Sequence, residues 1–87
     1  MSDWTWEYEP DAENVVGGLP SELVEQVAQM AQRLADAAGV KYIGDPPIEE
    51  SGVSKVFVYT EGILMLWYQE DRRYNAVYIL QAIPWPG

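Results

Sequence analysis

The chain has 87 residues, with 14 acidic and 5 basic side chains and a formal net charge of −9. This length predicts one small domain over residues 1–87, and the charge disfavours nucleic acid and anionic membranes as partners. The 87 residues include neither cysteine nor histidine, which excludes disulfides, thiolate chemistry and imidazole ligands or bases within them. These absences favour a binding protein over an enzyme, and we expect no cofactor and no metal.

The N-terminal half predicts a strand followed by two helices. Residues 4–9 alternate aromatic and polar side chains, which is the period of a half-buried strand. Residues 11–16 can form a short helix with Asp11 as its N-cap. Residues 21–38 carry apolar side chains at spacings of three and four, so we expect a long amphipathic helix that ends at Gly39.

The C-terminal half predicts an antiparallel meander. A short strand at 40–43 and a proline-containing loop at 44–52 lead into strands at 53–59, 63–69 and 74–83. A strand, two helices and then three or four strands require an α+β fold. We expect a twisted antiparallel sheet with a helical hairpin packed on one face.

This order of elements resembles the RelE/ParE toxin superfamily. The likeness is carried by two segments, WEYEPDAENVVGGLPSELVEQVAQMAQRLAD at 6–36 and SKVFVYTEGILMLWYQEDRRYNAVYILQAI at 54–83. The resemblance implies a β-α-α-β(3-4) fold. It also implies a place in a toxin–antitoxin pair, where family members either cleave messenger RNA on the ribosome or inhibit DNA gyrase.

The basic site of the RNA-cleaving members is matched here at one position. Lys55 corresponds to the family's strand lysine and is the single catalytic candidate, whereas Phe57 and Leu64 stand where the resemblance implies further basic residues. Cleavage through a 2′-hydroxyl needs a base, an acid and positive charge over the developing phosphorane, and Lys55 alone cannot supply all three. The sequence therefore favours a non-catalytic, divergent toxin–antitoxin component.

Other candidates for RNA chemistry have simpler explanations. Arg72 and Arg73 lie in a predicted turn flanked by acidic residues, which is typical of a solvated tip. Tyr59, Tyr68 and Tyr74 can in principle act as acids, but tyrosine in a strand usually packs.

The strand at 63–69 is apolar on both of its faces. Turning Met65 and Trp67 toward the long helix, together with Val58 and Tyr78, leaves a second apolar surface on the opposite side. At about 25 cal/mol per Å² of apolar area, leaving that surface in water would forgo several kcal/mol. The partner-binding residues predicted on it are Phe57, Tyr59, Leu64, Leu66, Tyr68, Ile79 and Trp85.

Three covers for this surface are possible: the chain's own tail and the 44–52 loop, a second copy, or a different protein such as an antitoxin-like segment. We expect a protein partner or a homodimer. The alternative functions are an active toxin, either a ribosome-dependent endoribonuclease or a gyrase inhibitor, and an acidic inhibitor that mimics nucleic acid. Because no apolar run is long enough to span a bilayer and the first residues lack a basic leader, we expect a cytoplasmic protein.

Overall fold

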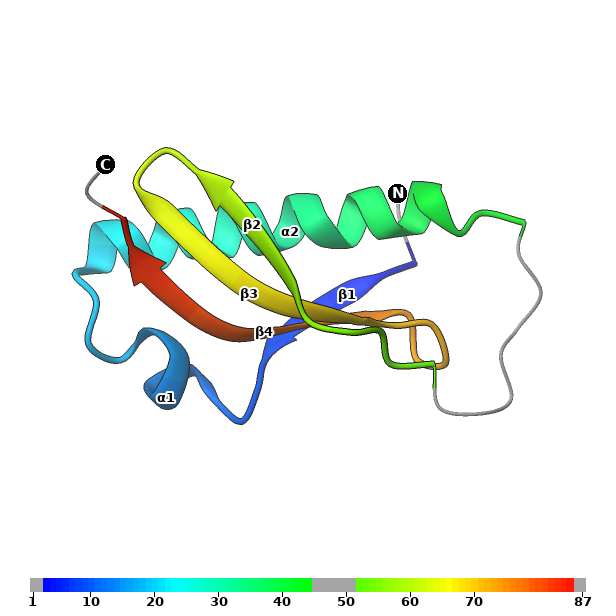
Figure 1. The fold of residues 1–87 in the computed structure, drawn as a ribbon, viewed down its shortest axis with the longest axis horizontal. Coiled ribbons are helices and arrows are strands. Elements are labelled where there is room, and N and C mark those ends of the chain that lie inside the picture. Colours follow the sequence, from blue (N-terminus) through cyan, green and yellow to red (C-terminus); the bar gives the residue numbers. More distant parts are fainter. Residues whose placement is uncertain (1–2, 45–51, 86–87) are drawn as a thin grey trace.

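The computed structural model describes residues 3–44 and 52–85, and these form an α+β fold (Figure 1). The α+β class predicted from the sequence is confirmed. The elements in chain order are β1 (Thr5–Tyr8), α1 (Ala12–Val16), α2 (Ser21–Lys41), β2 (Phe57–Glu61), β3 (Leu64–Asp71) and β4 (Ala76–Pro84).

The four strands form one mixed sheet in the order β1-β4-β3-β2. Strands β2, β3 and β4 pair antiparallel, as predicted, but β1 runs parallel to β4, with Thr5 opposite Ala76 and Tyr8 opposite Ile79. The expectation of a wholly antiparallel sheet is therefore wrong for β1. Alternation of apolar and polar residues shows that a segment is a strand, but it is the same for either strand direction.

Helix α1 begins as predicted. The Asp11 side chain caps it by accepting a 2.9 Å hydrogen bond from the backbone N–H of Asn14. Val15 and Val16 on this helix are buried and belong to the same hydrophobic cluster as residues of α2 and the sheet. Both helices therefore contribute to a single core.

Helix α2 continues past Gly39 to Lys41, so the predicted strand at 40–43 is wrong. Extension by these residues brings Lys41 and Tyr42 within hydrogen-bonding distance of Glu70 on β3. The Tyr42 ring also stacks on Trp4, with ring centroids 5.6 Å apart. These tertiary contacts outweigh the low helix propensity of glycine.

The hairpins begin later in the chain than predicted. Residues 53–56 lie outside the regular strands except for an isolated bridge from Val53 to Asp71, and β2 starts at Phe57. A two-residue turn of Gly62 (φ 59°) and Ile63 joins β2 to β3. Most of the predicted 44–52 loop, and the tail beyond Trp85, lie outside the described residues.

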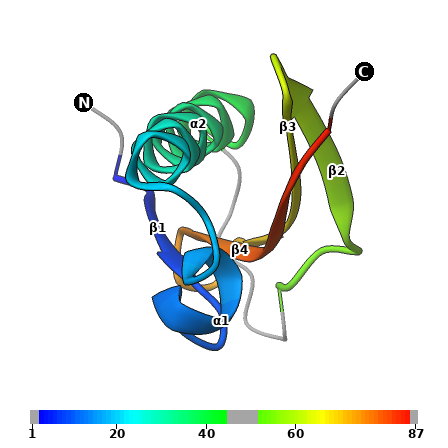
Figure 2. The same cartoon turned by 90° about the vertical axis from the view of Figure 1, so that its left-hand side faces the viewer.

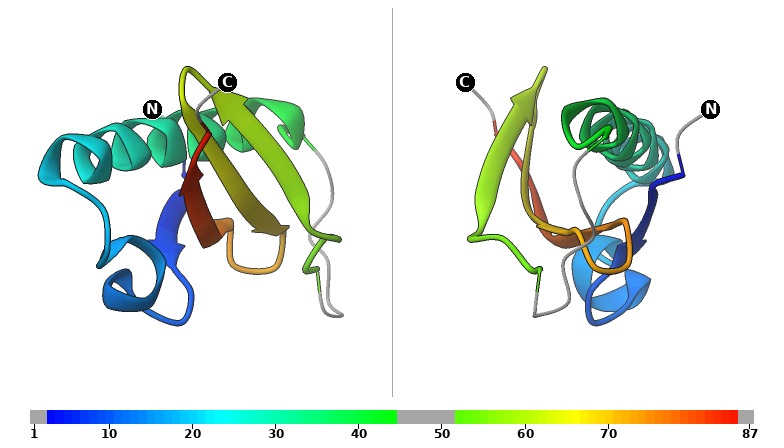
Figure 3. Two further views of the ribbon diagram at one scale, coloured as in Figure 1. Left: turned by 60° about the vertical axis from the view of Figure 1, so that its left-hand side comes forward. Right: turned by 90° about the vertical axis from the view of Figure 1, so that its right-hand side faces the viewer.

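The core lies between α2 and the sheet, which curls around that helix (Figures 2 and 3). Three alanines, Val27 and Met30 on the helix face apolar side chains on the strands. The buried residues include Val27, Met30, Ala31, Ala35 and Ala38 on α2 and Leu64, Leu66, Val77, Ile79 and Ala82 on the strands. We call this side of the sheet the inner face.

Candidate functional site

The opposite side of the sheet also carries apolar side chains, and we call these residues the outer face. Cross-strand pairs place Val58 beside Trp67, and Met65 beside Ile83, on the same side of the sheet. Along β3, Met65 and Trp67 alternate with the buried Leu64 and Leu66, so they lie on the opposite side of the sheet from the core. The outer face comprises Val58, Met65, Trp67, Leu80 and Ile83, none of which belongs to the core cluster or packs against it.

The structure therefore confirms that both faces of the meander are apolar, but it reverses the predicted orientation. Three of the predicted partner-binding residues, Leu64, Leu66 and Ile79, are fully buried against α2. Phe57, Tyr59 and Tyr68 are half-buried on the same inner side. The prediction that these six residues face away from the helix is wrong.

A β-bulge changes which side chains face the core along β4. Tyr68 pairs with Ile79 and the preceding Trp67 pairs with Gln81, so Leu80 has no partner of its own on β3. Unbroken alternation from Ile79 would turn Gln81 into the core. The extra residue instead buries Ala82, which is 7% exposed, and leaves Gln81 in solvent.

Trp85, the seventh predicted partner-binding residue, is 54% exposed. Its backbone N–H donates a hydrogen bond to the carbonyl oxygen of Ile63, which is 52% exposed at the β2–β3 turn. The described part of the tail therefore runs alongside the hairpin turn, with both apolar side chains accessible. A role for Trp85 in partner binding stays a prediction.

Lys55, the catalytic candidate, lies just before β2 on the inner side. Its Nζ is 5.7 Å from the centroid of the Phe57 ring, and Lys41 Nζ lies 5.4 Å from the same centroid. The two ammonium groups and the ring form a cation–π cluster. Sequence reasoning missed Lys41, because it placed this residue in a separate strand.

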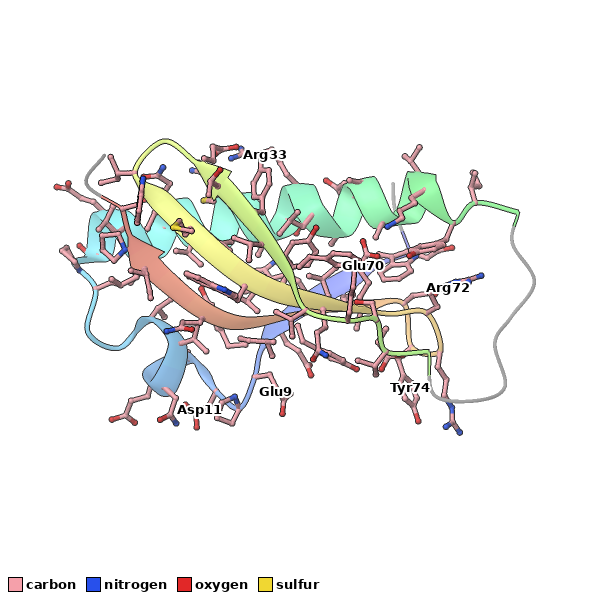
Figure 4. All side chains as sticks on the ribbon, viewed as in Figure 1. Glu9, Asp11, Arg33, Glu70, Arg72 and Tyr74 are labelled. Atoms are coloured by element: carbon pink, nitrogen blue, oxygen red, sulfur yellow. The ribbon has the colours of Figure 1, made fainter. Side chains whose placement is uncertain are left out.

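Lys41 is paired with a buried carboxylate. Glu70 on β3 is 4% exposed, and its carboxylate lies at the C-terminal end of α2 (Figure 4). Its Oε1 accepts hydrogen bonds from Lys41 Nζ at 3.0 Å and from the Tyr42 hydroxyl at 2.8 Å, while its backbone N–H donates to Ser54 Oγ at 2.9 Å. The hydrogen bond to Glu70 raises the pKa of Lys41. This arrangement joins the helix end to the sheet.

The β3–β4 turn is less solvated than predicted. Asp71 is 3% exposed: it accepts 2.7 Å and 3.0 Å hydrogen bonds from the Tyr78 hydroxyl and the Arg73 backbone N–H. The Arg72 side chain, half-buried, lies over the Tyr42 ring, with its guanidinium carbon 4.6 Å from the ring centroid. Arg73 is exposed, so the prediction of a solvated tip holds for this arginine and fails for Arg72.

Two of the tyrosines considered as acids, Tyr59 and Tyr68, and a third on β4, Tyr78, have pKa values raised further above neutrality. The hydrogen bond to Glu61 raises the pKa of Tyr59, and burial raises the pKa of Tyr68. The hydrogen bond to Asp71 raises the pKa of Tyr78 to about 12. An efficient general acid at pH 7 has a pKa near 7, so these environments oppose acid catalysis by the three side chains.

Within residues 3–44 and 52–85 there is no group of three or more acidic side chains arranged to hold a metal ion. No helix in them is both long and apolar enough to cross a bilayer.

The sheet thus has a half-exposed apolar outer face, and its inner side carries the hydrogen bonds of Lys41 and Tyr42 to Glu70. Comparison of the chain with protein-family models, with curated proteins and with solved structures finds no match. The resemblance to the RelE/ParE superfamily accordingly stays a prediction.

Proposed function

We propose that the protein is a non-catalytic binding domain that docks a protein partner on its outer face. The observation that carries this proposal is the exposure of apolar side chains on that face: Val58 is 51% and Ile83 38% exposed. Trp67 and Met65 lie between them on β3 and do not pack on the core. Since burial of apolar area gains about 25 cal/mol per Å², a partner that covers these side chains is stabilised on the sheet.

The chemistry around the outer face favours polypeptide over nucleic acid. The four strands contain no lysine or arginine, and nucleic acid binding depends on such charges to neutralise phosphates. Neutral Thr60, Gln69 and Gln81 border the apolar residues, and Glu7 projects from β1. A segment with one apolar stripe and a neutral or basic border fits this surface.

The RelE/ParE resemblance would make that partner an antitoxin-like segment and this chain a divergent toxin–antitoxin component. The pKa shifts of Tyr59 and Tyr68 support a binding role over RNA cleavage, because both move away from the range that proton transfer needs.

Site-specific photo-crosslinking in the organism that encodes the protein tests this proposal. A photoreactive residue at Gln81, which is exposed and paired with Trp67, is expected to form a covalent adduct with another protein. The same residue at Gln32, exposed on α2, is the matched control and is expected to form none.

The variant Trp67→Lys separates docking from chance proximity. Combined with the probe at Gln81, it should abolish the adduct while circular dichroism shows an unchanged fold, because a charge placed on the apolar face opposes burial. An adduct that survives Trp67→Lys, an equal yield from position 32, or no adduct at position 81 would overturn the proposal.

A further inference from the structure

Strand β2 has an open edge. It is the last strand of the sheet order, and in the described part of the chain no strand pairs with its second side. Glu61 and Leu64 close the two-residue turn, so alternate residues Glu61, Tyr59 and Phe57 direct their backbone groups toward β3. Val58 and Thr60 direct theirs toward the open edge, where they can pair with another strand.

The sequence of this edge is complementary to itself. Residues 55–61 read KVFVYTE, and an antiparallel copy centred on Val58 places side chains that attract one another in opposite positions. Lys55 falls opposite Glu61, Val56 opposite Thr60, and Phe57 opposite Tyr59. Opposite charges, paired aromatic rings and paired β-branched residues are the cross-strand combinations that stabilise a sheet.

The side chains that would meet lie on one face. Phe57, Tyr59 and Glu61 alternate onto the inner face of β2, and Lys55 shares that side because its ammonium group lies 5.7 Å from the Phe57 ring centroid. The Glu61 side chain is 35% exposed while it pairs with Arg33 and accepts a 2.8 Å hydrogen bond from Tyr59. It is therefore accessible to a further cation.

We propose that two copies of the chain pair antiparallel through β2, with Val58 on the two-fold axis. The two four-stranded sheets then become one eight-stranded sheet, with hydrogen bonds exchanged between the Val58 residues and between Thr60 and Val56. Residues 55–56, which precede β2 in the single chain, extend that strand in the dimer. The backbone edge provides the contact and the Lys55–Glu61 pairs fix the register. This interface uses the backbone edge of β2 and shares only Val58 with the outer face, and it does not rest on the proposed function.

The dimer is expected to be weak and dependent on concentration. A single seven-residue edge buries less than the roughly 1,200 Å² of a standard interface, which places it among transient associations. The formal charge of −9 on each copy adds a repulsion that salt screens beyond about 8 Å at physiological ionic strength. Pairing through the local Lys55–Glu61 contacts should therefore persist at 0.15 M salt.

Disulfide trapping tests the register directly, because the natural chain has no cysteine to interfere. In Val58→Cys the two Cα atoms of the dimer lie about 5.5 Å apart, within disulfide range, so oxidation should give a covalent dimer. In Thr60→Cys alone the equivalent atoms lie about 14 Å apart, so oxidation should give no covalent dimer. A mixture of Val56→Cys and Thr60→Cys chains should crosslink to each other.

Sedimentation velocity on cysteine-free variants provides a second readout. Thr60→Pro removes a backbone N–H that faces the open edge and leaves the β2–β3 pairing intact, so it should abolish the dimer. Trp67→Lys, on the outer face, should leave the dimer unchanged. A strict monomer at all concentrations, or Thr60→Cys chains that trap as well as Val58→Cys chains, would overturn this inference while leaving the Gln81 crosslinking result intact.

Discussion

Leu66 and Met65 are neighbours on β3 and face opposite sides of the sheet. Leu66 is fully buried and packs in the core with α2, whereas Met65 lies on the outer face outside that core. Removal of the Leu66 side chain leaves a cavity, so Leu66→Ala should lower the free energy of unfolding by about 2–5 kcal/mol. Met65→Ala should lower it by less than about 1 kcal/mol. Urea denaturation of both variants measures the difference, and equal losses would contradict the assignment of the two faces.

The ion pair of Lys41 with Glu70 should contribute to stability, whereas Lys55 should not. Lys41→Met leaves the buried Glu70 carboxylate with one hydrogen-bond donor fewer, and we expect a loss of about 1 kcal/mol, between the values for exposed and buried charged pairs. Lys55→Met removes an exposed cation and should change stability by less than about 0.5 kcal/mol. Urea midpoints of the two variants provide the comparison, and a larger effect at Lys55 would be inconsistent with the observed contacts.

The Tyr78 hydroxyl makes alkaline stability depend on pH. Its pKa in the folded protein is raised from 10.0 to about 12, because the neutral hydroxyl donates to Asp71. The stabilisation is therefore complete below pH 10 and is lost as the pH rises from 10 to about 12. Tyr78→Phe should flatten the dependence of stability on pH in this window, measured by urea denaturation at several pH values. Tyr74→Phe, at an exposed ring, is the control and should keep the wild-type slope.

Induced expression of the protein alone should leave bacterial growth and messenger RNA levels unchanged. The expectation follows from Lys55, because its ammonium group lies 5.7 Å from the centroid of the Phe57 ring, which Lys41 also approaches, and neither group supplies the acid and base that cleavage needs. Growth curves and RNA abundance after induction test it. Growth arrest with loss of messenger RNA, reversed by Lys55→Ala, would restore the endoribonuclease alternative; arrest with DNA damage would instead favour the gyrase alternative.

Local sequence signals predicted most of the elements correctly. Aromatic–polar alternation located β1, Asp11 marked the start of α1, and the apolar stripe located α2. Each of these signals depends on residues that are close together in the sequence, so a single sequence is enough to show them. The end of α2 was missed because it is set by the contacts of Lys41 and Tyr42 with Glu70, which is distant in sequence.

The orientation of the sheet faces could not be predicted from alternation. On β3 both Leu66 and Trp67 are apolar, so the pattern fits either orientation equally well. On β4 the bulge at Leu80 changes the parity within the strand, and no residue type near it signals a bulge. The buried state of Glu70 and Asp71 was missed for a related reason, since acidic residues beside a turn are ordinarily exposed.

The parallel pairing of β1 with β4 has a consequence for biosynthesis. The first strand of the chain docks against the last, so Thr5–Tyr8 has no backbone partner in the sheet until Ala76–Ile79 has left the ribosome. The aromatic segment Thr5–Tyr8 therefore lacks its backbone partner while the residues between β1 and β4 are synthesised, whereas the β2–β3 hairpin can form earlier from contacts local in sequence. Chaperone capture of nascent chains should accordingly centre on this segment.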